Sequence, residues 1–165
     1  MERPNWEEYF MSLACVAAIR SPDPVTKHGS IIVDKQKRIL GLGYNGFPRG
    51  GIDDSIYPLT RPEKYTFMAH SEVGAILNCS VRPEGATLYV TGEPCPTCMI
   101  YIIQAGILKV VYGKIKSHCV DSEWWKSTLL LAKNHRISLQ EYKGHRSPFD
   151  ILQDAKEYLI SKEWK

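Results

Sequence analysis

Two short motifs with metal-binding side chains constrain the fold of this chain more than any other feature. They are His70-Ser71-Glu72 and, further along, Pro94-Cys95-Pro96-Thr97-Cys98, and each opens a segment with a helical pattern, expected over residues 70–79 and 95–105. Cysteines three residues apart on a helix share one face. The exposed backbone N–H groups at a helix start favour the thiolate form that binds metal. A site built from both motifs requires the two helix starts to meet.

These side chains fit a catalytic zinc site. The imidazole of His70 and the thiolates of Cys95 and Cys98 make three ligands, which leaves the fourth tetrahedral position for water. We therefore predict one Zn2+ per chain. Zinc lowers the pKa of bound water from about 15.7 towards about 7. Glu72, two residues after His70, is predicted as the catalytic group that moves protons between this water and the substrate.

Other interpretations of the cysteines remain open. Cys95 and Cys98 could form a redox pair, although a redox motif does not require His-x-Glu on a preceding helix. A closed structural zinc site would need a fourth protein ligand, which Cys79 or Cys119 could supply. The odd total of five cysteines argues against a disulfide framework.

The periodicity predicts an α/β domain. Apolar strand patterns alternate with helical ones after an N-terminal helix, which indicates a layered sheet with helices. The first two strands are expected to form an antiparallel hairpin, and helices are expected to join the later strands. The expected strands cover residues 31–33, 39–43, 87–91, 109–112 and 137–142. The expected helices after the second motif cover a segment between residues 121 and 133 and residues 149–161.

Composition limits the partners. The 165 residues suit one domain, taken as 1–165, with an internal core. A net charge of +3 without a visible basic stripe argues against a nucleic acid as a partner. No apolar run reaches membrane-spanning length, and the N-terminus lacks the pattern of a signal peptide. We therefore expect no membrane association and a cytoplasmic location.

At these motifs the sequence resembles the zinc-dependent cytidine/deoxycytidylate deaminase superfamily. Within it, the chain is most similar to the deoxycytidylate (dCMP) deaminase group. The supporting segments are the N-terminal helix from Trp6, Arg20-Ser21-x-Asp23-Pro24, Gly43-Tyr44-Asn45-Gly46-x-Pro48, Asp53-Asp54 and residues 103–107. The resemblance implies a three-layer α/β/α fold around a mixed five-stranded sheet. It also implies hydrolytic deamination of dCMP to dUMP, and a homo-oligomer between a dimer and a hexamer.

The resemblance also assigns substrate contacts. Asn45 matches an asparagine that contacts the substrate sugar, although Asn-Gly is equally a good turn. Arg20 and Lys27 flank a loop that borders the pocket in relatives. Lys114 and Lys116 follow a strand near the place where relatives bind the 5′-phosphate, so Lys116 is a candidate phosphate ligand.

A second nucleotide site follows from the same resemblance. Many dCMP deaminases are activated by dCTP and inhibited by dTTP at a site near the Gly-Tyr-Asn-Gly-x-Pro loop. Here Gly46, Arg49, Asp53 and Asp54 keep much of that pattern, and the two aspartates could hold Mg2+ with a triphosphate. The segment between Asp54 and His70 contains no Cys or His, so a second zinc site is not expected there.

Three departures from the family pattern leave the preferred base open. His28 and Ser30 stand where relatives commonly have Val and Ala, and Ser71 stands where they have Ala. The segment Glu93-Pro94-Cys95-Pro96 resembles that of purine deaminases. The substrate could therefore be a 5-modified dCMP, dCTP or a purine nucleotide. A tRNA- or DNA-editing deaminase and a non-catalytic nucleotide-binding regulator are further alternatives. Ser71 is predicted to line the pocket, where its hydroxyl must bond to a neighbour, to water or to the ligand.

Overall fold

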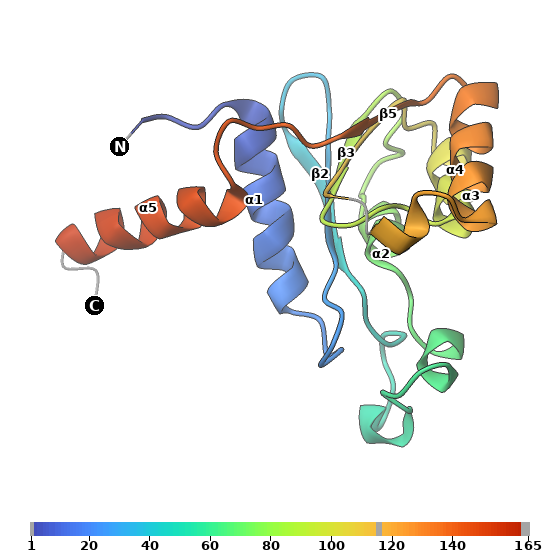
Figure 1. Ribbon diagram of the computed structural model, residues 1–165. Helices are drawn as coiled ribbons and strands as arrows, with labels where there is room; N and C mark the ends of the chain where they lie inside the picture. Colours follow the sequence, from blue (N-terminus) through green and yellow to red (C-terminus); the bar gives the residue numbers. More distant parts are fainter. Residues whose placement is uncertain (1, 115–116, 163–165) are drawn as a thin grey trace.

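A five-stranded mixed sheet forms the centre of the protein. The structure is a computed structural model that describes residues 2–114 and 117–162. The strands are β1 (Gly29–Val33), β2 (Ile39–Tyr44), β3 (Thr87–Val90), β4 (Lys109–Tyr112) and β5 (Ser138–Glu141). Their order in the sheet is β2-β1-β3-β4-β5 (Figure 1). The predicted α/β class and the five-stranded mixed sheet are therefore confirmed.

The pairing of the strands follows the connections between them. β1 pairs antiparallel with β2 through a tight turn, and antiparallel with β3. β3 and β4 run parallel, as do β4 and β5. Parallel neighbours need a crossover connection, and the helices α3 (Pro96–Gln104) and α4 (Glu123–Asn134) provide the two crossovers. The predicted hairpin followed by helix-linked strands is thus confirmed.

Helices cover both faces of the sheet. On one face, α1 (Trp6–Ile19) packs against β1, β2 and β3, and α5 (Pro148–Ser161) packs against α1 (Figure 1). On the other face lie α2 (Ser71–Leu77), α3 and α4. Alternation along β1 divides the two cores, because Ile31 joins Phe10 and Tyr89 in one cluster, whereas Ile32 joins Met99 in the other.

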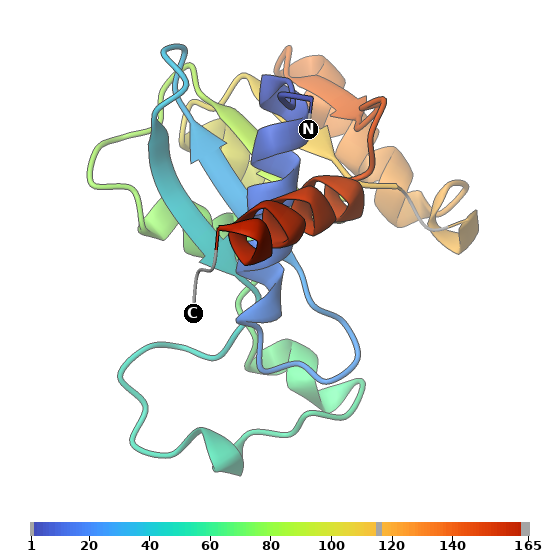
Figure 2. The same cartoon turned by 90° about the vertical axis from the view of Figure 1, so that its left-hand side faces the viewer.

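The chain between β2 and α2 leaves the sheet and returns to it. It contains the short 3-10 helices η1 (Asp54–Ile56) and η2 (Glu63–Thr66). A further 3-10 turn, η3 (Ser117–Cys119), follows β4. Figure 2 shows the first excursion extending away from the sheet. It comes back where Gly46 pairs with Ala69, directly before His70.

Helix lengths and hydropathy identify no membrane-spanning helix among the described residues.

Candidate active site

The two sequence motifs meet at the N-termini of α2 and α3. His70 is the N-cap of α2, and Cys95 is the N-cap of α3, with Pro96 in the first turn and Cys98 one turn further on. Proline suits the first turn because the N–H that it lacks would have no helical partner. The Nδ1 atom of His70 lies 3.5 Å from Sγ of Cys95 and 3.3 Å from Sγ of Cys98. The predicted convergence of two helix starts is therefore present.

This donor set fits zinc. The three ligand atoms all lie within 4.8 Å of one another, and these residues form the only such group of His, Cys, Asp or Glu in the described part of the chain. Tetrahedral bonds of ordinary length place a nitrogen and a sulfur ligand about 3.6 Å apart, close to the distances seen here. Neither Cys79 nor Cys119 belongs to the group. Three protein ligands and an open position are typical of a catalytic centre.

The ligand side chains share protons with one another. The hydrogen bond from Cys98, together with His70, lowers the pKa of Cys95 to about 4, and the same contact raises the pKa of Cys98. A hydrogen bond to Cys95 raises the pKa of His70 above its ordinary value, although burial works in the opposite direction. Metal binding releases such shared protons, because zinc takes the thiolate and the neutral imidazole.

Glu72 lies beside this group on α2, with only 4% of its surface exposed. Burial raises the pKa of its carboxyl group above the ordinary value. The hydroxyl of Ser71 lies 3.1 Å from Oε2 of Glu72 and 2.8 Å from the hydroxyl of Ser30 on β1. Ser30 and Ser71 are both completely buried. The two serines therefore bond to each other and to the carboxyl group of Glu72.

A cavity of about 540 Å3 opens over these residues. This volume is in the range of ordinary ligand pockets. His70, Ser71, Glu72 and Cys95 lie in its wall, and the remaining wall comes from several other segments of the chain. These segments contribute Asp23, Thr26 and His28; Asn45; Arg61, Lys64, Tyr65 and Met68; and Val90, Glu93, Pro96, Thr97 and Trp124. Side chains far apart in sequence thus share one pocket.

Asn45 joins two walls of this pocket. Its Oδ1 accepts a hydrogen bond of 2.7 Å from the backbone N–H of His28, and its Nδ2 donates a bond of 2.9 Å to the carbonyl of Thr26. The same Nδ2 lies 3.2 Å from Sδ of Met68. The amide is therefore held in one orientation at the pocket wall.

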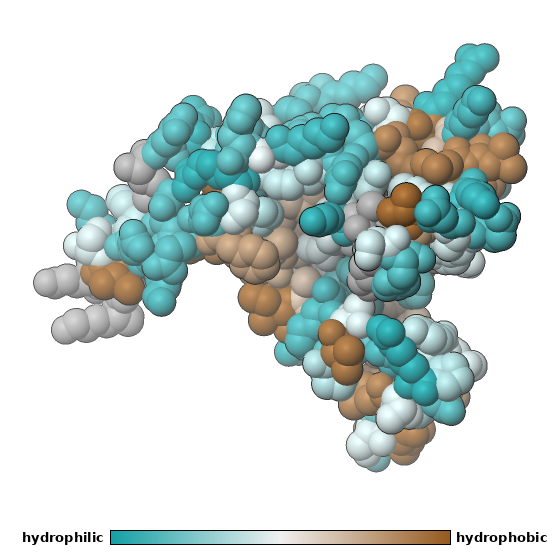
Figure 3. All heavy atoms as spheres, in the orientation of Figure 1, coloured by the Kyte–Doolittle hydropathy of each residue, from teal (hydrophilic) through white to brown (hydrophobic). Residues whose placement is uncertain are grey.

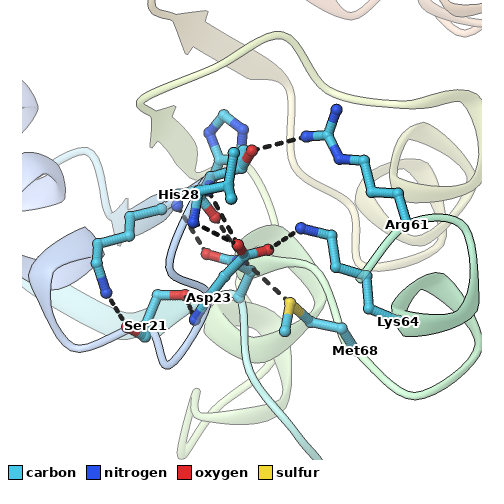
Figure 4. Close-up of polar contacts among 10 residues, drawn as sticks. Ser21, Asp23, His28, Arg61, Lys64 and Met68 are labelled. Atoms are coloured by element: carbon cyan, nitrogen blue, oxygen red, sulfur yellow. Dashed lines mark hydrogen bonds and ion pairs between the residues drawn. The ribbon is translucent and has the colours of Figure 1, made fainter. Parts of the chain in front are cut away.

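A buried ion pair fixes the neighbouring part of the wall. Nζ of Lys64 lies 2.5 Å from Oδ2 of Asp23, and both side chains are almost fully buried (Figure 4). The other oxygen of Asp23 accepts hydrogen bonds from the backbone N–H groups of Val25 and Thr26. Burial raises the pKa of Asp23, but the hydrogen bonds and the charge of Lys64 outweigh it, so that its pKa is lowered.

Comparison with known proteins assigns this architecture to a family. The family model of the cytidine and deoxycytidylate deaminase zinc-binding region matches residues 4–114. The chain belongs to this deaminase family. It is 38% identical to the deoxycytidylate deaminase of Mus musculus over 158 residues, which cover 92% of this chain and 87% of the mouse protein. It is 41% identical to the Homo sapiens deoxycytidylate deaminase over 124 residues, or 71% and 69% of the two chains.

A solved structure of the same deaminase family matches the fold. The dCMP deaminase of the cyanophage S-TIM5, crystallised in complex with dCMP and dUMP, superimposes with a TM-score of 0.68 at 26% identity. The match covers 86% of this chain and all of the phage chain. The expected three-layer fold therefore agrees with that of a dCMP deaminase.

The basic residues predicted to bind the substrate do not line the pocket among the described residues. Neither Arg20 nor Lys27 belongs to the pocket wall, and Nζ of Lys27 donates instead to the carbonyl of Ser21. Lys114 is also absent from the wall, and Lys116 lies outside the described residues. The roles of Arg20, Lys27 and Lys116 in substrate binding remain predictions.

The residues predicted for a second nucleotide site lie on the excursion. Gly46 pairs with Ala69, and Arg49 donates a hydrogen bond to the side chain of Asn78. Oδ1 of Asp53 caps η1 by accepting the backbone N–H of Ser55. Hydrogen bonds from the side chain and the backbone of Ser55 lower the pKa of Asp53. Asp54 is the first residue of η1. Regulation by nucleotides and binding of Mg2+ at this place remain predictions.

Sequence reasoning missed several pocket residues. Arg61, Lys64 and Tyr65 lie on η2 or directly before it, and the sequence offered no motif to single them out. Glu93 was noted only for its family likeness, but its Oε2 is buried without a hydrogen-bond partner in the described structure. The sequence offered one signal for Glu93, namely a carboxylate two residues before the predicted ligand Cys95.

Proposed function

We propose that this enzyme hydrolyses the amino group of dCMP, with dUMP and ammonia as products, through His70, Cys95, Cys98 and Glu72. The observation that supports this most directly is the burial of Glu72 beside the three converging ligand side chains in one pocket wall. The relatives named above are deoxycytidylate deaminases, and the phage relative was crystallised with dCMP and dUMP. A free nucleotide is favoured over a nucleic acid because the net charge is only +3.

The ligand group would hold Zn2+ through Nδ1 of His70 and the sulfur atoms of Cys95 and Cys98. When bound there, zinc supplies the Lewis acidity that makes water a nucleophile near neutral pH. The helix start at Cys95 assists, since the backbone N–H of Cys98 lies 3.2 Å from Sγ of Cys95 and stabilises its negative charge.

Glu72 moves the protons in this proposal. Its carboxylate takes a proton from the attacking water as oxygen adds to C4 of the base. The carboxyl group then protonates ring nitrogen N3. The carboxylate next takes the second proton of the added water from the hydroxyl group on C4 and passes it to the amino group, which leaves as ammonia when the C–N bond breaks and the C4 carbonyl forms. A raised pKa suits this double role, because the group must hold the proton between the two transfers. The net reaction consumes one water and regenerates the carboxylate.

Asn45 and Ser71 complete the site in this proposal. The amide of Asn45, fixed between Thr26 and His28, presents a polar group to the sugar. Ser71 lines the pocket, but its hydroxyl is directed to Glu72 and Ser30. We therefore assign Ser71 to the carboxyl group rather than to the base.

Ammonia release across a nucleotide panel tests the proposal. The panel contains dCMP, dCTP, 5-modified dCMP and purine nucleotides, with deoxycytidine as the unphosphorylated control. We expect dCMP to be deaminated fastest. Glu72→Gln should lower kcat by at least about 100-fold while zinc remains bound, and Glu157→Gln on the distant α5 should match the parent. Normal turnover by Glu72→Gln would exclude this role.

One observation favours a second candidate substrate. The buried Oε2 of Glu93 has no partner in the described structure, and Glu93 lines the pocket. An acceptor left without a donor costs about 1–3 kcal/mol. A base with an additional N–H or O–H donor, in a purine or a 5-modified cytosine nucleotide, would satisfy it. The panel decides this, because Glu93→Gln would then change the ranking of the bases.

We propose a homo-oligomer as the active form. Ile100 and Tyr101 on α3 and Leu129 and Leu130 on α4 are large apolar side chains that remain exposed. Figure 3 shows hydrophobic residues gathered over the region of α3 and α4. Light scattering on a sizing column should give a mass that is a multiple of 18.8 kDa. A strictly monomeric active enzyme would refute this assignment.

We further propose that the excursion with Gly46, Arg49, Asp53 and Asp54 binds a regulatory triphosphate with Mg2+. Arg49 and the two carboxylates supply the charges that a magnesium triphosphate requires. We expect dCTP with Mg2+ to raise activity and dTTP to lower it. Hyperbolic kinetics unaffected by either nucleotide would contradict this.

A cytoplasmic location is proposed because all five cysteines are free thiols, which suits a reducing compartment; cell fractionation tests it.

A further inference from the structure

The basic side chains of the pocket wall differ in whether a neighbouring acidic group neutralises their charge. Lys64 is neutralised by the buried Asp23, and His70 contacts the two cysteines. Arg61 also lines the pocket, but no carboxylate of the described residues lies within ion-pairing distance of it. Its positive charge is therefore available to an anion that enters the pocket.

Neighbouring side chains hold the guanidinium of Arg61 in place. Its Nη2 donates a hydrogen bond of 2.7 Å to Oγ1 of Thr26. The guanidinium carbon lies 5.8 Å from the centre of the Tyr65 ring, which is the range of a cation–π contact. Figure 4 shows Arg61 reaching from its loop towards the segment that contains His28. One of five N–H donors is occupied, so most of the planar fork remains free.

We propose that Arg61 binds the 5′-phosphate of the substrate and thereby selects nucleotides over nucleosides. The proposal rests on the proposed function, because it concerns the phosphate end of the nucleotide whose base reacts at Glu72. A guanidinium recognises phosphate through two parallel N–H···O bonds. Both Arg61 and Glu72 lie in the wall of the same cavity, on different segments of the chain.

The buried ion pair between Asp23 and Lys64 holds the segment that bears Arg61 in place. Asp23 holds the backbone of Thr26, and Lys64, three residues after Arg61, is anchored to Asp23. The segment that bears Arg61 and the segment that bears Thr26 are thus joined twice. By contrast, Arg20 and Lys27 lie outside the pocket wall. Arg61 is therefore the phosphate ligand that the described structure favours over these two.

The test compares Arg61→Gln and Arg61→Lys with the parent. The matched control is Arg38→Gln, since Arg38 lies in the β1–β2 turn, pairs with Asp34 and does not line the pocket. Each protein is assayed for kcat/KM with dCMP and with deoxycytidine. Binding of dUMP and of deoxyuridine is measured by calorimetry. Charged hydrogen bonds predict that Arg61→Gln weakens dUMP binding and lowers kcat/KM for dCMP by about 10- to 100-fold.

Nucleosides give the decisive contrast. Deoxycytidine turnover and deoxyuridine binding should be unchanged in Arg61→Gln, Arg61→Lys should recover part of the loss, and Arg38→Gln should match the parent. Equal losses for nucleotide and nucleoside, or no loss of dUMP affinity, would overturn the proposal. If the parent deaminates neither dCMP nor deoxycytidine, the proposed function fails. The calorimetric comparison still decides whether Arg61 recognises the phosphate.

Discussion

Two buried serines form a chain of hydrogen bonds to the carboxyl group of Glu72. An ionised carboxylate has no proton to give, so Ser71 must donate to Oε2 of Glu72, and Ser30 must then donate to Ser71. Hydrogen bonds arranged in one direction strengthen one another. The two serines therefore form a buried chain of hydrogen bonds that ends at the carboxyl group of Glu72.

This arrangement makes a prediction that a double-mutant cycle can test. Ser71→Ala leaves the hydroxyl of Ser30 buried without a partner, so it should lower the free energy of unfolding by about 1–3 kcal/mol. It should also reduce kcat by about tenfold, with KM unchanged, because Glu72 loses its donor. The double variant Ser30→Ala with Ser71→Ala should regain stability while kcat stays low. Recovery of kcat together with stability would show that the serines serve packing alone.

The ligand assignment makes a second prediction at the residue scale. Cys98→Ala removes one of three ligands, so zinc content should fall from about one ion per chain to well below half, and activity with it. Elemental analysis of the purified protein measures this. Cys79→Ala is the control, because Cys79 is a thiol bonded to the carbonyl of Ala75, away from the ligand group. Full zinc content in Cys98→Ala would refute the assignment.

The helix α2 packs closely against the sheet. A Cβ atom added at Gly43 would lie 2.2 Å from the backbone nitrogen of Ala75 and 2.3 Å from the carbonyl oxygen of Ser71. The backbone of α2 therefore rests directly on β2, with no side chain between them. This contact sets the height of His70 and Glu72 relative to α3.

Gly43→Ala should disturb the site through this contact. The added methyl group meets backbone atoms, which cannot rotate away, so α2 must shift, at a cost of about 1–3 kcal/mol in unfolding free energy. We expect a marked loss of activity and weaker zinc retention. Gly74→Ala in α2 itself is the matched control, since its nearest neighbour would be 3.6 Å away and alanine favours a helix. Equal behaviour of the two variants in denaturation and activity assays would contradict the prediction.

For the whole molecule, the Asp23–Lys64 pair joins segments that are distant in the chain. Asp23 follows α1, and Lys64 belongs to η2 in the long excursion. A buried pair that loses one partner leaves an uncompensated charge, which destabilises by about 3–5 kcal/mol. The pair therefore ties the excursion, with Arg61, to the body of the protein.

The stability from this pair should depend on pH. The pKa of Asp23 is lowered in the folded protein, so its contribution is present above the unfolded pKa of about 3.9 and is lost as pH falls through the folded value. Urea unfolding of the parent and of Asp23→Asn should show the largest gap above about pH 5 and a shrinking gap below about pH 4. A gap that does not change with pH would show that the charge on Asp23 contributes nothing. Combining Asp23→Asn with Lys64→Met should restore part of the loss.

The sequence by itself predicted the sheet, its strands and helices, and the meeting of the two motifs. These features follow from local patterns: apolar periodicity marks the elements, and ligand chemistry requires His70, Cys95 and Cys98 to converge. Only the tertiary structure decided which residues close the pocket. Arg61 and Lys64 stand in a segment without periodicity, and their place depends on a buried pair with Asp23, 41 positions away from Lys64. Contacts between distant segments leave no local pattern, because each residue taken alone resembles a solvated surface charge.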